Sequence, residues 1–293
     1  LKRLVHYGFF LYRNIMNRIL LFLTILLFSS GVKADVSENI SAYLSNLVPG
    51  EGDTEVSIDL RENYKPDYSV LAVREIEKTD NGNYFTQLSL FNTEKDNDER
   101  IVANLGIGKR ILSEDKTLLT GFNAFIDYDD NNNARTSIGF EMRSAVLELT
   151  YNKYIRLDDG DKEKVLDGYD LRLDSQIPYM HWAKVFINSY EWDGRDRADI
   201  KGRQIGSDLT LSPSLQFEFS HDDKDLSGLE DEWSAQLTFV HPPRKGPSLQ
   251  DGLLSTSACS ESRDLSDSLL TKVKRDNKIF VEFSGKTTIS RAD

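Results

Sequence analysis

The feature that most constrains the fold of this 293-residue chain is an alternation of polar and apolar side chains with a period of two. In residues 118–128, Phe122 and Ile126 share one face of an extended chain, and Asn123 and Asp127 share the other. This period places successive side chains on opposite faces of a β-strand. The pattern therefore predicts strands with one polar and one apolar face.

About twelve segments of this kind follow one another over residues 54–241, although those near 67–77 and 83–93 are placed mainly by their spacing. Most run for about ten residues. Tilted membrane strands need about 9–11 residues, whereas strands of globular proteins average about 5–6. The charged faces also carry Gly, Ser and Asn, as a wet lumen would, and the opposite faces are apolar and aromatic. We therefore expect an all-β fold, an antiparallel transmembrane β-barrel.

The connections between the segments supply an independent test. Outer-membrane barrels have tight turns at the periplasmic end and longer loops outside. Short and long connections alternate here in the same way, although residues 130–133 are few for their side. A soluble β-sandwich, the alternative fold, gives no reason for this sorting. The tight connections are 113–116, 143–144 and 212–213, and the longer ones are 93–99, 156–167, 192–199 and 222–231.

The composition excludes several classes of protein. The formal net charge of −12 argues against nucleic acid as a partner, because phosphate backbones attract clustered Lys and Arg. The single cysteine, Cys259, rules out an internal disulfide and any multi-cysteine metal site. The mean hydropathy is −0.46, and no apolar run after the N-terminus approaches the about 20 residues of a membrane-spanning helix. If the chain meets lipid, it does so through strands.

The N-terminal stretch has the parts of a secretory signal peptide. An arginine precedes a ten-residue apolar core at 19–28, and Ala34 ends an A-x-A-like cleavage site. We expect residues 1–34 to be the signal peptide, with Met16 as the true start and cleavage before Asp35. An uncleaved anchor is the alternative, but the core is too short for a comfortable membrane span. The signal peptide predicts export.

Two further segments flank the predicted barrel. Residues 35–53 form a short polar lead. Residues 242–293 form a linker that begins with a stretch rich in Pro, Gly and Ser. Within it, Leu269 and Val273 belong to an apolar series at helical spacing, which predicts a helix over 261–274. The rest of the linker is expected to be extended.

Three stretches carry motifs of a known family. Residues 106–141 contain N-x-F-x-D-Y-D followed by R-x-S-x-G-x-E, and residues 168–194 contain G-x-D-L-R, a proline-containing turn and an aromatic-rich strand. The third stretch is LLTKVKRDNKIFVEF at 269–283. Together they resemble the inverse autotransporter β-domain of the intimin/invasin family, over roughly residues 54–285.

The resemblance implies a twelve-stranded antiparallel barrel in the bacterial outer membrane. The chain would enter the first strand and leave the last strand on the periplasmic side. The linker would thread through the lumen, first as a helix and then as extended chain. Outer-membrane lipid would surround the barrel, and the barrel-assembly machinery and periplasmic chaperones would be its partners. Family members also carry an adhesive passenger of immunoglobulin-like domains, which we do not expect here. Adhesion is therefore not implied, and no surface ligand is predicted.

Four side chains at alternate positions have the spacing that opens a calcium-binding loop. However, Asn132 stands where that loop needs glycine, and Ile138 stands where it needs glutamate. A hairpin turn is the better interpretation. The four histidines have no zinc-like spacing, and the sequence contains no nucleophile elbow or phosphate loop. We predict no catalytic site, metal or cofactor. The four side chains are Asp127, Asp129, Asn131 and Asn133.

Charged side chains on the polar strand faces are the candidate functional residues. In a barrel they would point into the lumen and pair with one another or with the linker, because burying an unpaired charge is costly. In an ordinary sheet they would form a solvated face, and this alternative stays open. The candidates are Arg100, Arg135, Glu141, Arg143, Asp170, Arg172 and Asp174.

Three functions are compatible with these observations. The first is a translocation and anchoring barrel that displays its own C-terminal segment. The second is a small structural or channel-forming outer-membrane protein. The third is a soluble periplasmic β-sandwich that binds a ligand. Strand length, face alternation and the resemblance favour the first.

Overall fold

The computed structural model of the protein describes residues 48–62, 64–95, 98–225, 231–259 and 263–283. The expected signal peptide, its cleavage site at Ala34 and Asp35, and most of the lead segment lie outside the described residues. Within the described residues, no helix is long and apolar enough to cross a membrane.

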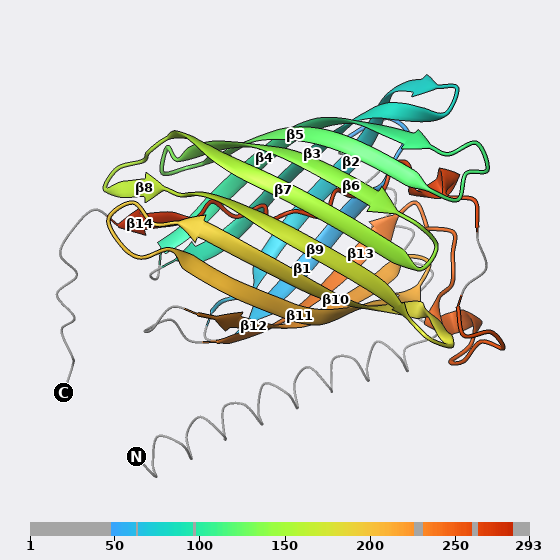
Figure 1. The fold of residues 1–293 in the computed structure, drawn as a ribbon. Helices are drawn as coiled ribbons and strands as arrows, with labels where there is room; N and C mark the ends of the chain where they lie inside the picture. Colours follow the sequence, from blue (N-terminus) through green and yellow to red (C-terminus); the bar gives the residue numbers. More distant parts are fainter. Residues whose placement is uncertain (1–47, 63, 96–97, 226–230, 260–262, 284–293) are drawn as a thin grey trace, which may run out of the picture. The chain divides into compact units, whose positions relative to one another are not determined.

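Twelve antiparallel strands close into a barrel, in which each strand is hydrogen-bonded to its two neighbours (Figure 1). The last strand closes on the first, and Thr54 lies opposite His241. The expected twelve-stranded antiparallel barrel is therefore confirmed, and the sandwich alternative is wrong. The barrel strands are β1 (Thr54–Arg61), β2 (Asp67–Thr79), β3 (Gly82–Lys95), β4 (Asp98–Leu112), β5 (Leu119–Asp129), β6 (Ala134–Arg143), β7 (Leu147–Asp158), β9 (Asp167–Ile177), β10 (Met180–Asp193), β11 (Ile200–Ser212), β12 (Leu215–Lys224) and β13 (Glu232–His241).

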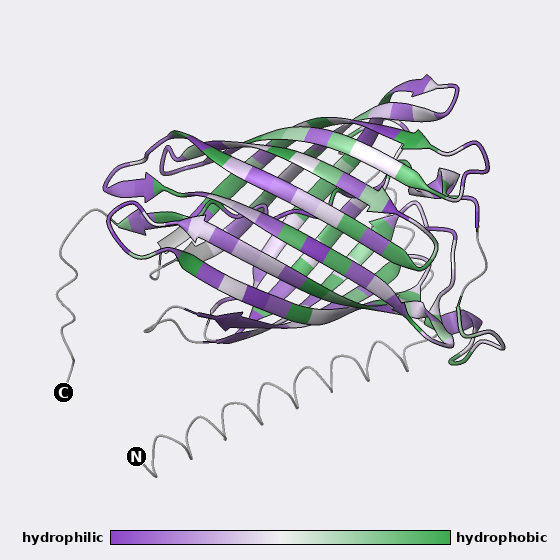
Figure 2. Cartoon of the chain, viewed as in Figure 1, coloured by the Kyte–Doolittle hydropathy of each residue, from purple (hydrophilic) through white to green (hydrophobic). Residues whose placement is uncertain are grey.

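The alternation in the sequence becomes the two surfaces of the barrel wall. On β5, Phe122 and Ile126 are more than half exposed on the outer wall, whereas Asn123 and Asp127 are buried on the inner side. Figure 2 shows the result as apolar and polar residues alternating along each strand. An apolar outer wall around a polar interior is the arrangement that a lipid-embedded barrel requires.

The strand connections differ at the two barrel ends. At the turn end, short connections join β2 to β3, β9 to β10, and β11 to β12. At the loop end, the β7–β9 connection contains a short strand, β8 (Glu163–Val165). The long loop expected at 93–99 is wrong, because the β3–β4 ladder continues through Thr93–Arg100 to Lys95–Asp98. The residues of this part of the ladder are mostly charged, and a run of charged residues looks the same in the sequence whether it forms paired strands or a loop.

The linker first crosses the turn end and then enters the barrel. The helix expected over 261–274 is wrong, because the described part holds one 3-10 turn, η2 (Ser266–Ser268), and otherwise irregular chain. The helical spacing of Leu265 and Val273 instead serves two separate wall clusters, one around Leu119 and one around Phe125. The barrel surrounds the linker with side chains that bond the linker backbone. The linker therefore needs neither a single apolar face nor the internal hydrogen bonds of a helix.

Candidate functional site: the charged lumen and the segment it holds

The lumen near the turn end contains a buried triad of charges on β4 and β6. Arg110 Nε donates to Glu141 Oε1 at 2.6 Å, and Arg143 Nη2 donates to Glu141 Oε2 at 2.5 Å. Arg110 also reaches the carbonyl oxygens of Leu269 and Thr271 in the linker, at 2.8 and 2.7 Å. One carboxylate thus orients two guanidinium groups, and both of these hold the linker backbone.

The centre of the lumen is organised around Asp127. Its carboxylate accepts hydrogen bonds from Arg135 Nε at 2.8 Å and from Arg275 Nη2 of the linker at 2.6 Å, and all three side chains are fully buried. The Arg275 guanidinium lies 4.2 Å from the centroid of the Phe125 ring. That ring lies flat on β4 because Gly106 has no Cβ, which would otherwise stand 2.2 Å from a ring carbon. Charge and stacking together fix the position of Arg275.

A second group of charges surrounds Lys274. Arg172 Nη2 lies 2.9 Å from Asp174, 2.8 Å from Asp208 and 3.6 Å from Glu218. The Lys274 ammonium lies between the first two carboxylates, at 2.7 and 3.1 Å. Three wall carboxylates from β9, β11 and β12 are thereby joined to one wall guanidinium and one linker ammonium.

Asp170 holds the linker through an intermediary. It accepts hydrogen bonds from Asn152 Nδ2 at 2.8 Å and from the Tyr154 hydroxyl at 2.5 Å. The Tyr154 oxygen in turn accepts the backbone N–H of Asp276 at 2.7 Å. A wall carboxyl group therefore positions a hydroxyl group against the linker backbone.

Several wall side chains bond linker carbonyl groups rather than linker side chains. Arg143 donates to the oxygen of Lys272 at 2.9 Å, and Arg135 donates to that of Asp276 at 2.6 Å. In the opposite sense, the N–H of Val273 donates to Gln87 Oε1 at 2.8 Å. These bonds replace the hydrogen bonds that a helix would have made, and they do not depend on the side chains of the linker.

At the loop end the linker becomes strand β14 (Val281–Phe283), which pairs with β8. Phe280 stacks on Trp192 with ring centroids 4.1 Å apart. The Glu282 carboxylate accepts the backbone N–H groups of Arg195 and Asp196, at 3.2 and 3.0 Å. We call residues 279–283 with their partners the exit clasp. Its apolar cluster joins the linker to the wall through Phe91, Val102, Val165, Ile279 and Val281.

Two carboxylates outside the membrane-spanning strands support the exit clasp. Burial alone would raise the pKa of Glu163, but hydrogen bonds from Arg100 and Asn133 outweigh it and hold that pKa below its usual value. Asp159 has a lowered pKa as well, because bonds from Arg195 and the N–H of Val165 outweigh its burial. Both groups are therefore anionic at neutral pH.

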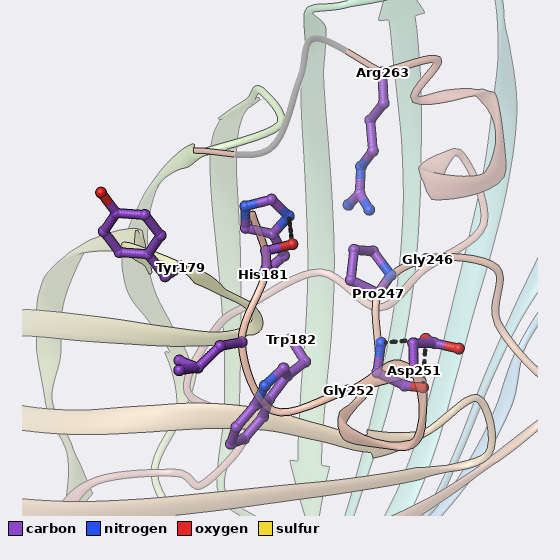
Figure 3. Close-up of a pocket in the computed structure, with 11 residues that line it drawn as sticks. Tyr179, His181, Trp182, Gly246, Pro247, Asp251, Gly252 and Arg263 are labelled. Carbon is purple, nitrogen blue, oxygen red and sulfur yellow. Dashed lines mark hydrogen bonds between the residues drawn. The ribbon is translucent and has the colours of Figure 1, made fainter. Parts of the chain in front are cut away.

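At the turn end, residues 242–259 fasten the linker before it enters the lumen. Trp182 Nε1 donates to the carbonyl of Leu253 at 3.0 Å, and His181 Nε2 lies 3.1 Å from that of Ser257. A hollow of about 410 Å³ lies between the start of β10, which carries His181 and Trp182, and the linker, and Arg263 also lines it (Figure 3). These contacts place the start of the lumen segment beside the mouth of the barrel.

The seven charges selected from the sequence fall into two places. Six lie on the inner wall and take part in the networks described above, and Arg100 lies at the loop end. Arg100 contacts Asp129 at 3.2 Å and Glu163 at 2.6 Å. The stretch that resembles a calcium loop is a hairpin turn, in which Asp129 accepts the N–H groups of Asn131 and Asn133. Among the described residues, no group of three His, Cys, Asp or Glu could hold a metal ion.

Sequence reasoning missed other residues of equal weight. Arg110 shares the strand and the polar face of Arg100, so extending the same alternation by ten residues would have found it. Asp208 and Glu218 follow the same parity rule on β11 and β12. The pairing of Lys274 and Arg275 with particular wall carboxylates gave no sequence signal, because it depends on which wall level each linker residue reaches.

Comparisons with known proteins agree with this geometry. A family model described as "Inverse autotransporter, beta-domain" matches residues 26–277. A structure from work on the in-meso crystallization of membrane proteins is similar with a TM-score of 0.63 and 21% identity, over 79% of this chain and 99% of that one. None of the curated proteins compared with the chain matches it.

Weaker structural likenesses are found among other outer-membrane barrels. The KdgM porin is similar with a TM-score of 0.45 and 5% identity, over 64% of this chain and 98% of the porin. The translocator domain of the autotransporter NalP from Neisseria meningitidis has a TM-score of 0.34 and 12% identity, over 72% of this chain and 96% of that domain. The matching family is one of outer-membrane barrels and not of enzymes. Because its model covers most of the chain, the protein belongs to the inverse autotransporter β-domain family and is a barrel of the bacterial outer membrane.

Proposed function

We propose that the barrel anchors the chain in the outer membrane and carries its C-terminal segment through the lumen to the cell surface. The observation that supports this most strongly is an unbroken series of contacts along the linker. It begins where the N–H of Leu265 bonds the carbonyl of Lys116 in the β4–β5 turn, and it ends at the β8–β14 pair in the opposite loops.

The length of the segment agrees with a full crossing. Residues 265–283, if extended, would span roughly 60 Å at about 3.3 Å per residue. The membrane with its interfaces is about 40–45 Å thick. Tight turns mark the periplasmic end of outer-membrane barrels, so the exit clasp would lie outside the cell. In this scheme residues 1–34 direct export, residues 35–53 lead into the barrel, and the assembly machinery and periplasmic chaperones insert it.

A channel is the alternative function for an outer-membrane barrel. It has less support, because linker side chains and wall charges meet at successive levels of the lumen, as Lys272 does with Glu55 at 3.0 Å and Lys278 with Asp67 at 3.1 Å. A pore occupied in this way conducts only if the linker leaves.

Cysteine labelling on intact cells tests the proposal. Cys259 is exposed and lies on the periplasmic side of the lumen segment in this scheme. Thr287→Cys, made in a Cys259→Ser background, introduces a thiol that follows the exit clasp in the sequence. A maleimide attached to a polymer too large for porins should label Thr287→Cys on intact cells and Cys259 only after permeabilisation. Labelling of both sites only after permeabilisation would refute surface display.

A further inference from the structure

The inner wall is not electrostatically balanced without the linker. Within the described wall, ion pairs join Asp174, Asp208 and Glu218 to a single wall cation, Arg172. Lys274 supplies a further positive charge at this level, and it also lies 3.1 Å from Glu148, which pairs with the wall cation Lys184. Removing Lys274 would leave the Asp174 and Asp208 carboxylates sharing the Arg172 guanidinium, and crowded carboxylates that are shielded from water favour a bound cation.

The same arrangement occurs at two other levels of the lumen. Nearer the turn end, Lys272 lies 3.0 Å from Glu55. Nearer the loop end, Lys278 lies 3.1 Å from Asp67 and 3.7 Å from Asp59. Each linker lysine therefore meets carboxylates from a different part of the wall, and the occupied levels follow one another along the extended chain.

Apart from the buried Asp127–Arg275 pair and the bond from Arg143 to the Thr271 hydroxyl, many wall contacts do not depend on the linker sequence. Arg110, Arg143 and Arg135 bond backbone carbonyl groups of the linker, which any chain would offer. Wall guanidinium groups thus bind the backbone of the linker, and wall carboxylates bind its basic side chains. A neutral or acidic chain could make the first set of bonds, but it would leave the carboxylates of the second set without counter-charges.

We propose that the lumen is a selective track for linear polycations, and that the segment it accepts is an extended peptide with basic side chains spaced as Lys272, Lys274 and Lys278 are. This inference rests on the proposed function for its biological role, because it names the class of chain that the barrel holds. It concerns binding within the lumen and applies whether or not the chain end reaches the surface.

The test uses the full chain with two matched sets of substitutions. In one variant Lys272, Lys274 and Lys278 are replaced by Gln, and in the control they are replaced by Arg. Both are inserted into planar bilayers after heat-modifiable gel migration has shown a folded barrel. The Arg variant should stay as closed as the natural protein. The Gln variant should open frequently and favour cations over anions, because the emptied wall is rich in carboxylates.

Peptides added to the open variant then test selectivity directly. A synthetic peptide with the sequence of residues 270–283 should block the current at a concentration at least about tenfold lower than the same peptide with its three lysines replaced by Gln, which corresponds to about 1.4 kcal/mol. Equal block by both peptides, or a Gln variant as closed as the Arg control, would overturn the proposal.

Two further measurements keep the outcomes distinct. If the triple Gln variant does not fold, Lys274→Gln alone serves, since it removes the ammonium with the most carboxylate contacts; unchanged gating in that variant counts against the proposal. Surface labelling of Thr287→Cys in the natural sequence is read separately. Its failure would refute display while leaving the peptide comparison valid, and equal block by the two peptides would refute selectivity while leaving display intact.

Discussion

Two stretches of one linker are held in different ways. Residues 271–278 lie among charges, and their firmest contact is the fully buried pair of Arg275 and Asp127. Residues 279–283 lie among apolar side chains and pair as a strand with β8. The first stretch is fixed mainly by charge pairs, whereas the second combines a strand pair and the Glu282 bonds with burial of apolar surface.

The difference indicates a division of tasks. Charge pairs specify which residue lies at which level, because a shift by one position separates each cation from its carboxylate. Apolar packing is less specific, but it excludes water, and we therefore expect it to close the pore at the loop end. Substitutions in the first stretch should therefore unseat the linker, and substitutions in the second should let ions pass.

The largest effect is expected from Arg275→Leu. It leaves the buried Asp127 with one guanidinium fewer, and breaking a buried pair typically costs about 3–5 kcal/mol. Urea unfolding in detergent micelles should show a loss of this size. The control is Arg203→Leu on the outer wall near the loop end of β11, where the side chain is exposed and the change should stay within about 1 kcal/mol. Equal losses in both variants would mean that the lumen pair is not special.

A smaller loss of stability, but a larger leak, is expected from Phe280→Ala. Phe280 is half-buried against Trp192, so its removal should cost about 2 kcal/mol, less than the about 3–5 of a fully buried phenylalanine. Bilayer currents should rise while the linker stays seated. If Phe280→Ala remained closed and Arg275→Leu alone leaked, the division of tasks would be wrong.

Lys278→Gln should have a weak effect although it lies in the charged stretch. The Lys278 side chain is 32% exposed, and partly solvated ion pairs contribute at most about 1 kcal/mol. Its effect on unfolding should shrink further in high salt, in contrast to that of Arg275→Leu. A loss of stability as large as that of Arg275→Leu would show that the exposure of an ion pair does not determine how much it stabilises the protein.

The smallest effect concerns pH and the exit clasp. The pKa values of Asp159 and Glu163 are lowered in the folded protein, so their contribution is complete above the unfolded values near pH 4 and is lost as pH falls through the folded ones. Hydrogen-exchange protection of the β14 amides, corrected for the intrinsic exchange rate at each pH, should therefore fall below about pH 4 before the barrel opens. An equal loss of protection across β5 would argue against a local cause.

The sequence predicted the wall better than its contents. Alternation was sufficient to place Arg135 and Glu141 inside, because side-chain direction in a strand is a local property. It could not show that Leu265 and Val273 occupy two separate wall clusters, since that depends on the surrounding barrel. The helical spacing was therefore misread, and the partners of Arg275 were missed for the same reason.

The most direct test of a linker inside the barrel is a disulfide between β8 and β14. Val281 and Val165 are direct cross-strand partners. With Cys259 replaced by Ser, the variant with Val281→Cys and Val165→Cys should form a disulfide in the outer membrane under mild oxidation. This disulfide should keep the linker from leaving the lumen. The control pair, Val281→Cys with Leu237→Cys on the outer wall, should not. Absence of the Val281–Val165 disulfide in a folded barrel, or equal cross-linking in the control, would contradict a linker that runs through the lumen to the loop end.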